Sequence, residues 1–346
     1  MVRVLIVDDS AFARLSISKQ LSTDLEIEVV GFATDGIEAL EKIGELKPDV
    51  ITLDVEMPRM GGLKALEHIM AKDPTPVVML SSLTDKGSET TIRALELGAI
   101  DFFLKGSRAT STGYYGLNNN LNTKIRLAAL VERTKLKRAT KRKEIRRRPE
   151  RLRNKYSNSS NRVVVIGSST GGPTALYELI PNLPDDIPAS MLVVQHMPPV
   201  FTKSLADRLN QLSQIEVKEA EIGDCLKAGQ VLLAPGDYHM TVETEGRVRL
   251  DQGPPVLGLR PSVDVTMRSV AQVYGNLSIG VVLTGMGADG TKGAASIKAA
   301  GGKVTAQDEA TCVVYGMPRS VVESGNVDKI LPLSRISREL ILMCQE

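Results

Sequence analysis

Short, continuously apolar runs alternate with amphipathic stretches twice along this chain, and that alternation constrains its fold more than any other feature. In residues 1–106 the apolar runs are VRVLIV, DVITL and PVVML, and the stretches between them, such as GGLKALEHIMAK, have apolar residues at helical spacing. Strands that are apolar throughout are typical of a parallel sheet covered by helices on both faces. Strands that alternate regularly with helices predict the α/β class.

The alternation begins again near Val163, with the runs RVVVIG, SMLVVQH, QVLLAP, LSIGVVLTG and GKVTAQD. A chain of 346 residues is also too long for one ordinary core. We therefore predict two doubly wound parallel-sheet domains, at residues 1–122 and 161–346, joined by a helical and basic linker over residues 123–160.

The linker carries a concentrated positive charge. Residues 133–155 contain 13 lysine and arginine residues against two acidic ones, although the net charge of the whole chain is only +2. Such a block can contact nucleic acid or a membrane surface. Since the rest of the chain is acidic and would repel a polyanion, we interpret the block as a solvated linker. We expect no nucleic-acid binding, and no membrane insertion because no apolar run approaches ~18 residues.

The first residues and the cysteines indicate the cellular location that we expect for the protein. The first residues form a short apolar strand that ends in acidic residues, which is unlike a secretory signal. The three cysteines, Cys225, Cys312 and Cys344, are an odd number and lack metal-binding spacing. We expect neither a disulfide framework nor a zinc site, and a cytoplasmic location.

Acidic residues follow two predicted strands of the first domain. Asp8 and Asp9 come directly after VRVLIV, and Asp54 comes directly after DVITL. Functional groups gather at the carboxyl ends of parallel strands, and three close carboxylates are stable only with a cation or with raised pKa values. Oxygen ligands suit Mg²⁺. With Ser81 and Lys105 after further strands, the set predicts a site that accepts a phosphoryl group on an aspartate.

The motifs IVDD, LDVEMPRMGG, LSS and DFFLK, at these separations, resemble the receiver domain of two-component response regulators. The resemblance covers residues 1 to about 106 and implies a flavodoxin-like fold. It implies that a partner histidine kinase phosphorylates Asp54. The implied ligands of Mg²⁺ are Asp8, Asp9, Asp54 and the backbone carbonyl of Glu56.

The same resemblance gives roles to three further residues. Lys105 matches the lysine that contacts the phosphoryl group, and Ser81 and Phe102 occupy the positions that relay phosphorylation. Gly106 departs from the family, which usually has proline after this lysine.

The second domain opens with a glycine-flanked serine. Gly167, Ser169 and Gly171 satisfy G-x-S-x-G directly after an apolar strand and before a helical stretch. A serine on such a turn has an exposed hydroxyl, and the helix N-terminus offers backbone donors to a developing oxyanion. Serine is also a common helix cap, so the motif indicates catalysis only if a base and an acid accompany it.

Only three histidines compete for the role of base. His68 lies inside a helical stretch of the first domain, and His239 follows a Pro-Gly turn. His196 directly follows the strand SMLVVQ, at the same predicted sheet edge as Ser169. We therefore predict that His196 is the general base.

An acid that orients the base would complete the constellation. Asp289 lies in a glycine-rich turn after another apolar strand and meets the same edge, with Asp264 and Asp308 as alternatives. The chain order of serine, histidine and acid differs from that of α/β-hydrolases and disfavours that fold.

The glycine-rich turn also suggests a different function. Gly285, Gly287 and Gly290 fit G-x-G-x-x-G, and Asp308 follows ~20 residues later, as in an NAD site. Asp289 would place a carboxylate beside the pyrophosphate, however, where like charges repel. We therefore keep NAD binding as an alternative only.

Six motifs of the second half are similar to those of the catalytic domain of the chemotaxis protein-glutamate methylesterase family, over about residues 161–346: IGSSTGGP, VQHMPPVFTKSLADRLN, LAPGDYHM, RPSVDV, LTGMGADG and QDEATCVVYGMPRSV. The resemblance implies a Rossmann-like domain with Ser169 as nucleophile, His196 as base and Asp289 as orienting acid. It implies an oxyanion hole from the backbone N–H groups of Met286 and of the serine turn, at Thr170.

This resemblance implies hydrolysis of glutamyl methyl esters, and deamidation of certain glutamines, on methyl-accepting chemoreceptors, with no cofactor for ester hydrolysis. It implies a role in chemotaxis adaptation. It also implies that the unphosphorylated receiver blocks the catalytic edge and that phosphorylation of Asp54 relieves this block. A DNA-binding response regulator is the other alternative, although residues 133–155 show no helix-turn-helix pattern.

Overall fold

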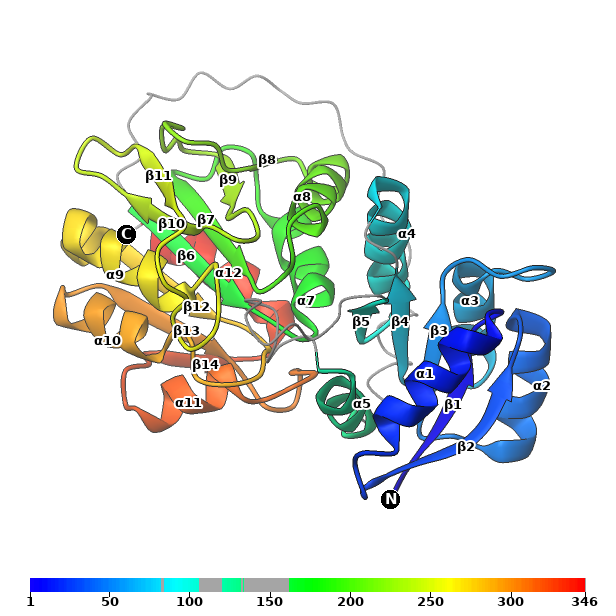
Figure 1. Cartoon of the computed structure of the whole chain (residues 1–346). Coiled ribbons are helices and arrows are strands. Elements are labelled where there is room, and N and C mark those ends of the chain that lie inside the picture. The colour runs from blue at the N-terminus through cyan, green and yellow to red at the C-terminus, as the bar shows by residue number, and fades with distance from the viewer. Residues whose placement is uncertain (82–83, 106–119, 132, 134–161, 346) are drawn as a thin grey trace. The chain divides into compact units, whose positions relative to one another are not determined.

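The computed structural model describes residues 1–81, 84–105, 120–131, 133 and 162–345. The chain divides into two compact units, Met1–Glu144 and Ile145–Glu346, whose elements are labelled in Figure 1. Most of the basic segment, and the stretch that starts at Gly106, lie outside the described residues.

The first unit is built on a five-stranded parallel sheet in the order β2–β1–β3–β4–β5. Its strands are β1 (Val2–Val7), β2 (Ile27–Ala33), β3 (Val50–Asp54), β4 (Val77–Ser81) and β5 (Asp101–Leu104). This order confirms the expected flavodoxin-like fold. It also makes β1 and β3 neighbours at the point where the strand order reverses, which is where such sheets bind ligands.

Among the described residues, four helices connect these strands, and a fifth follows the last of them. They are α1 (Ala11–Leu21), α2 (Gly36–Leu46), α3 (Gly62–Lys72), α4 (Asp85–Glu96) and α5 (Leu121–Ala129). Side chains of Ser10, Asp35, Thr84 and Asn120 accept backbone N–H bonds at the start of four of them. Helix α5 contacts β1, β3, β4 and β5, so the described first part of the expected linker packs on this sheet.

The second unit has a seven-stranded parallel sheet in the order β14–β13–β12–β6–β7–β9–β8. Its strands are β6 (Arg162–Ser168), β7 (Ala189–Gln195), β8 (Glu216–Glu219), β9 (Gln230–Leu233), β12 (Ser278–Val282), β13 (Lys303–Gln307) and β14 (Lys329–Leu331). The five predicted runs are β6, β7, β9, β12 and β13, which confirms the second α/β domain. The edge strands β8 and β14 were not predicted, because they are short and partly exposed.

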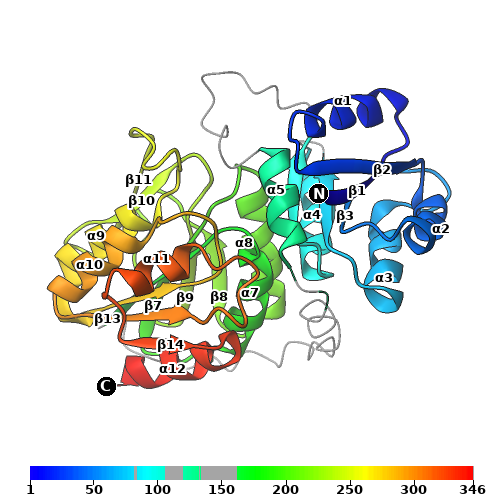
Figure 2. The same ribbon diagram turned by 90° about the horizontal axis from the view of Figure 1, so that it is seen from below.

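The remaining elements of this unit cover the sheet. They are α7 (Gly172–Leu179), η1 (Ile180–Asn182), α8 (Phe201–Leu212), the antiparallel pair β10 (His239–Val242) and β11 (Val248–Asp251), α9 (Val263–Tyr274), η2 (Gly275–Leu277), α10 (Thr291–Ala299), α11 (Met317–Glu323) and α12 (Leu333–Gln345). Helices α9, α10 and α11 lie along one face and α12 along the other (Figure 2). The β10–β11 hairpin was not predicted.

The order in which the chain forms these strands distinguishes one edge of the sheet as a place for a binding site. The chain enters at the central strand β6, moves to β7 on one side and returns to β12 on the other. The loops that follow β12, β6 and β7 therefore meet at a topological switch point, the place where open α/β sheets bind ligands. None of the described helices combines the length and apolarity that a membrane crossing requires.

Candidate functional site

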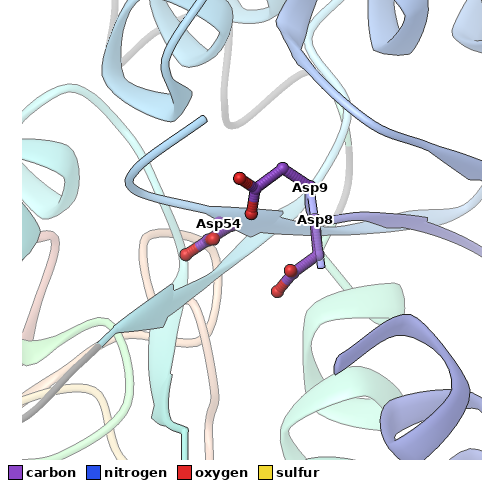
Figure 3. Close-up of side chains that lie close together, drawn as sticks. All are labelled: Asp8, Asp9 and Asp54. Carbon is purple, nitrogen blue, oxygen red and sulfur yellow. The ribbon is translucent and has the colours of Figure 1, made fainter. Parts of the chain in front are cut away.

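Three acidic side chains meet at the carboxyl edge of the first sheet. Asp8 and Asp9 directly follow β1, and Asp54 is the last residue of β3. Because these strands are neighbours, one carboxylate oxygen of each residue lies within 4.8 Å of those of the other two (Figure 3). Asp8 and Asp54 are buried, whereas Asp9 is exposed, so the cluster is open to solvent on one side.

Lys105, the first residue after β5, brings a positive charge to this cluster. Its Nζ lies 2.7 Å from Asp54 Oδ2 and 3.1 Å from Asp8 Oδ2. Burial raises the pKa of the Asp54 carboxyl, and the Lys105 ammonium opposes this only in part. Burial would lower the pKa of Lys105, but the two carboxylates outweigh it and raise the pKa. Lys105 is thus held in its charged form beside the predicted phosphoryl acceptor.

The donor set of this edge fits Mg²⁺. Three carboxylates and an open side suit a hard cation that keeps several water ligands. One lysine leaves their combined negative charge uncompensated, which a divalent cation would offset. Glu56, whose carbonyl oxygen is the expected fourth ligand, lies in the loop after β3, and among the described residues that oxygen accepts no hydrogen bond.

The two residues expected to relay phosphorylation lie on neighbouring strands. Ser81 ends β4, and its Oγ is 2.7 Å from Thr91 Oγ1 in α4. Phe102 is buried within β5, where its ring centroid lies 5.8 Å from the Lys124 Nζ. Ser81 therefore reaches the carboxyl edge with the acids, whereas Phe102 lies inside the sheet.

In the second unit, Ser169 follows β6 on a tight turn into α7. Its carbonyl accepts the Gly172 N–H at 2.8 Å, and Gly171 has a φ of +75°, a conformation that favours glycine. The Ser169 N–H donates to the Thr284 carbonyl, 3.0 Å away in the loop after β12. Ser169 is 8% exposed. Within the described parts of the chain its hydroxyl forms no hydrogen bond.

His196 and Asp289 form a direct pair. His196 follows β7, Asp289 lies in the loop after β12, and His196 Nε2 is 2.8 Å from Asp289 Oδ2. Both side chains are buried. The other ring nitrogen, Nδ1, is also buried and has no hydrogen-bond partner among the described residues. Since a carboxylate only accepts hydrogen bonds, Nε2 carries the proton when the ring is neutral, and Nδ1 of that tautomer offers its lone pair.

The Asp289 carboxylate accepts four further hydrogen bonds. The donors are Ser262 Oγ at 2.9 Å, Val263 N at 2.7 Å, Asp264 N at 2.9 Å and Gly290 N at 3.1 Å. Burial alone would raise the pKa of Asp289. The hydrogen bond from His196, the charge that its ring carries when protonated, and the backbone donors outweigh burial and lower the pKa below its ordinary value. Asp289 is therefore ionised although it is buried.

Gln195, the last residue of β7, links the serine turn to the histidine. Its Nε2 donates to the Ser169 carbonyl at 2.9 Å and to the His196 carbonyl at 3.1 Å, and its Oε1 accepts from Ser168 Oγ at 2.6 Å. One side-chain amide thus contacts the backbone of the serine turn and the backbone of His196. The Ser169 hydroxyl and His196 Nδ1 are not hydrogen-bonded to each other, as is common in enzymes without substrate.

Backbone donors lie beside the serine. A Cβ on Gly285 would come within 2.8 Å of the Ser169 Cβ, so the loop after β12 lies directly against the serine turn. Met286 is the next residue, and its N–H donates no hydrogen bond to a described residue. The Thr170 carbonyl accepts from Thr284 Oγ1 at 3.0 Å, which orients that turn. The Met286 and Thr170 N–H groups are the candidates for an oxyanion hole.

The alternative residues from the sequence have other partners. Asp264 and Asp308 accept hydrogen bonds from backbone N–H groups, and in the described structure neither bonds to His196. His239 Nε2 contacts a backbone carbonyl oxygen at 3.1 Å. Gly285 of the G-x-G-x-x-G pattern packs tightly against Ser169.

Sequence reasoning missed several residues that support this site: Ser168, Gln195, Ser262, Thr284 and Gln307. Ser168, Gln195 and Gln307 are the last residues of apolar strands, the same signal that selected Asp54. Ser262 follows no strand; it lies in the RPSVDV motif, from which no role was assigned to it.

Comparison with known proteins gives the context of both sites. Residues 164–340 match the CheB methylesterase family, and residues 4–111 match the response regulator receiver domain. A protein-glutamate methylesterase/protein-glutamine glutaminase of Symbiobacterium thermophilum is 51% identical over 97% of this chain and 95% of its own length. The Thermotoga maritima protein of that name is 48% identical over 99% and 98%. The crystal structure of the Thermotoga maritima CheB methylesterase catalytic domain matches with a TM-score of 0.52 and 51% identity, over 54% of this chain and 100% of that structure.

Proposed function

We propose, from the premise that this chain belongs to the family of protein-glutamate methylesterase/protein-glutamine glutaminase enzymes, that it hydrolyses glutamyl methyl esters with Ser169, His196 and Asp289. Phosphorylation of Asp54 activates this hydrolysis. The observation that carries the proposal is the 2.8 Å contact of His196 Nε2 with Asp289, which leaves the buried Nδ1 without a partner among the described residues.

The mechanism follows from which ring nitrogen is available. His196 Nδ1 takes the Ser169 proton as the hydroxyl oxygen attacks the ester carbonyl, and Asp289 stabilises the resulting imidazolium. The N–H groups of Met286 and Thr170 bind the oxyanion, each contributing about 3 kcal/mol. His196 then protonates the departing methanol, and water releases the glutamate through the same steps in reverse. With a glutamine side chain the same steps release ammonia.

In the receiver, the Asp54 carboxylate attacks the phosphoryl group of a histidine kinase. Lys105 lies 2.7 Å from Asp54 Oδ2, where its charge stabilises the oxygens of the transferred group. Asp8, Asp9, Asp54 and the Glu56 carbonyl would hold Mg²⁺. When bound, the ion would neutralise negative charge on the attacking and transferred oxygens. Ser81 and Phe102 would relay phosphorylation to the rest of the receiver.

The proposed substrates are methyl-accepting chemoreceptors, and the pathway is adaptation in chemotaxis, in the cytoplasm. The proposed division of the chain is a receiver over residues 1–122, a linker over residues 123–160 and a catalytic domain over residues 161–346. The first part of that linker, α5, packs on the receiver sheet.

Substitution of Asp54 by asparagine tests the regulatory half of this proposal. With acetyl phosphate and Mg²⁺, the unmodified chain is expected to take up phosphate and to release methanol from a methylated receptor fragment several-fold faster. Asp54→Asn is expected to take up none and to show the same rate with and without the donor, because the acceptor oxygen is lost. Chelation of Mg²⁺ is expected to remove the stimulation of the unmodified chain.

Asp73→Asn is the control for this experiment, because Asp73 is the exposed C-cap residue of α3 and pairs with Arg133, not with Lys105. It is expected to be stimulated like the unmodified chain. Stimulation of Asp54→Asn by the donor would contradict the assignment of the phosphorylated residue.

Replacement of Thr284 by valine tests the anchor of the serine turn. Thr284 is 1% exposed, and its Oγ1 accepts the Val314 N–H at 2.9 Å and donates to the Thr170 carbonyl. Thr284→Val is expected to lower the free energy of unfolding by about 1–3 kcal/mol, because a buried N–H loses its acceptor. It is expected to lower kcat by up to about 100-fold through misplacement of the turn.

Urea denaturation and methanol release measure these two effects. Thr284→Ser keeps the hydroxyl and is the matched control, expected to retain most of the activity. Equal activity of Thr284→Val and the unmodified chain would show that the hydroxyl does not position the serine.

A further inference from the structure

Helices α9 and α10 cap each other in a reciprocal exchange, in which an aspartate at the start of each helix accepts backbone N–H groups at the start of the other. Asp289, at the end of the loop that leads into α10, accepts the N–H groups of Val263 and Asp264 in the first turn of α9, at 2.7 and 2.9 Å. In return, Asp264 Oδ1 accepts the N–H groups of Gly290 and Gly293 at the start of α10, at 2.9 and 2.7 Å. The two helices lie side by side (Figure 1).

This exchange replaces the ordinary caps of both helices. The first N–H groups of a helix need acceptors from outside it, which its own N-cap side chain usually provides. Neither Ser262, the N-cap of α9, nor Gly290, the N-cap of α10, forms such a bond. The close approach depends on Gly293, where a Cβ would lie 2.6 Å from the Met267 Cβ and 3.1 Å from the Asp264 Cα. The position of each aspartate therefore depends on the other helix.

The bonds of Asp264 end at the loop that carries the reacting groups. This loop follows β12 and contains Met286 and Asp289. Its beginning is held by Thr284, whose N–H donates to Gln307 Oε1 at 2.9 Å. Its end is held at Gly290, whose N–H is shared between Asp264 Oδ1 and Asp289 Oδ1. Met286 lies between these anchors and is half-buried, so loss of the Gly290 anchor is expected to loosen the part of the loop that carries the oxyanion donor and the acid.

Burial of the Asp264 carboxylate costs free energy that packing alone would not offset. It is 1% exposed. Burial raises the pKa of its carboxyl, and the nearby Asp289 adds to the rise, while the N–H groups of Gly290 and Gly293 oppose it. A second buried carboxylate beside a first is destabilising unless hydrogen bonds and helix dipoles offset it. The hydrogen bonds of Asp264 hold the loop in place, and this role explains why a buried carboxylate is kept there.

We propose that Asp264 is a positioning residue for ester hydrolysis, which holds Asp289 and the Met286 N–H in place through the α9–α10 exchange. The proposal rests on the proposed function, because it assumes that Asp289 orients His196. Asp264 forms no hydrogen bond to His196 in the described structure; it acts through the loop.

The test compares three substitutions in the full chain, activated with acetyl phosphate and Mg²⁺, with methanol release from a methylated receptor fragment as the assay. Asp264→Ala removes the acceptor and is expected to lower kcat by about 10- to 100-fold with KM changed less than about threefold. Asp264→Asn keeps an oxygen acceptor at the same place and is expected to restore most of kcat.

Asp328→Ala is the matched control. Asp328 also accepts a backbone N–H, from Val304 at 2.7 Å, and pairs with Lys298 near the other end of α10. Its loss is expected to destabilise the same domain while kcat of the folded protein stays unchanged. Unfolding curves for all variants separate loss of folded protein from loss of kcat.

The outcomes distinguish this inference from the function on which it rests. If Ser169→Ala, assayed in parallel, retains full activity, the proposed function fails. If Ser169→Ala is inactive while folded Asp264→Ala keeps the kcat of the unmodified chain, or Asp264→Asn loses as much as Asp264→Ala, only the positioning role fails. If Asp264→Ala does not fold, Asp264→Glu takes its place, because its extra methylene displaces the acceptor. The proposal then requires kcat to fall for Asp264→Glu and to persist for Asp264→Asn.

Discussion

Replacement of Ser169 by alanine is expected to lower kcat for methanol release by about 10⁴-fold or more, because the hydroxyl that forms the acyl intermediate is lost. The residual rate would come from the oxyanion donors and from substrate binding. Ser169 forms no side-chain hydrogen bond within the described residues, so the substitution is expected to leave the free energy of unfolding nearly unchanged. Stopped assays of methanol release and urea denaturation measure the two quantities on one preparation.

The neighbouring serine provides the control for this substitution. Ser168 precedes Ser169 and donates its hydroxyl to Gln195 Oε1 at 2.6 Å. Ser168→Ala is expected to reduce stability more than Ser169→Ala does and to retain far more activity. If Ser168→Ala were the inactive variant and Ser169→Ala the active one, Ser169 would not be the nucleophile.

Replacement of Asp289 by asparagine is expected to lower kcat by about 10⁴-fold, because it reverses the tautomer of the base. Among the described residues, every group that contacts the Asp289 oxygens is a hydrogen-bond donor, including His196 Nε2. An amide nitrogen turned toward His196 would need Nε2 as an acceptor, which moves the ring proton to Nδ1. Nδ1 then cannot take the Ser169 proton. ¹⁵N chemical shifts of the His196 ring are expected to report protonated Nε2 in the unmodified chain and protonated Nδ1 in Asp289→Asn.

Asp308→Asn is the control, because Asp308 was an alternative acid and bonds to Thr311 in another loop. It is expected to leave both the tautomer and kcat unchanged. An Asp289→Asn variant with an unaltered tautomer and nearly full activity would remove Asp289 from the catalytic mechanism.

The fold class followed from local patterns. Continuously apolar runs separated by stretches of helical period predicted two parallel α/β sheets, and the strand orders confirm that class. The same patterns did not predict β8, β14 or the β10–β11 hairpin. Each of these elements has only three or four residues and contains exposed or half-buried positions, so neither its length nor its apolar period separates it from a loop.

The candidate residues followed from one geometric rule that needs no coordinates. The carboxyl ends of parallel strands share an edge, so Asp8, Asp54, Ser169, His196 and Asp289 were selected as residues that follow apolar runs. The rule names the edge but not the neighbours along it. By this rule Asp289, Asp264 and Asp308 were all open as the acid. The family resemblance implied Asp289, and that residue lies 2.8 Å from His196 Nε2.

The sequence by itself determined the period of each element, the two α/β sheets and the residues at their carboxyl edges, because these depend on residues close together in the chain. The tertiary structure decided which side chains meet. His196 and Asp289 are 93 residues apart, and their contact depends on β6 lying between β7 and β12. It also decided which ring nitrogen of His196 is available and that α9 and α10 exchange their caps. Both depend on hydrogen bonds between segments that only the packing of distant helices and loops brings within reach.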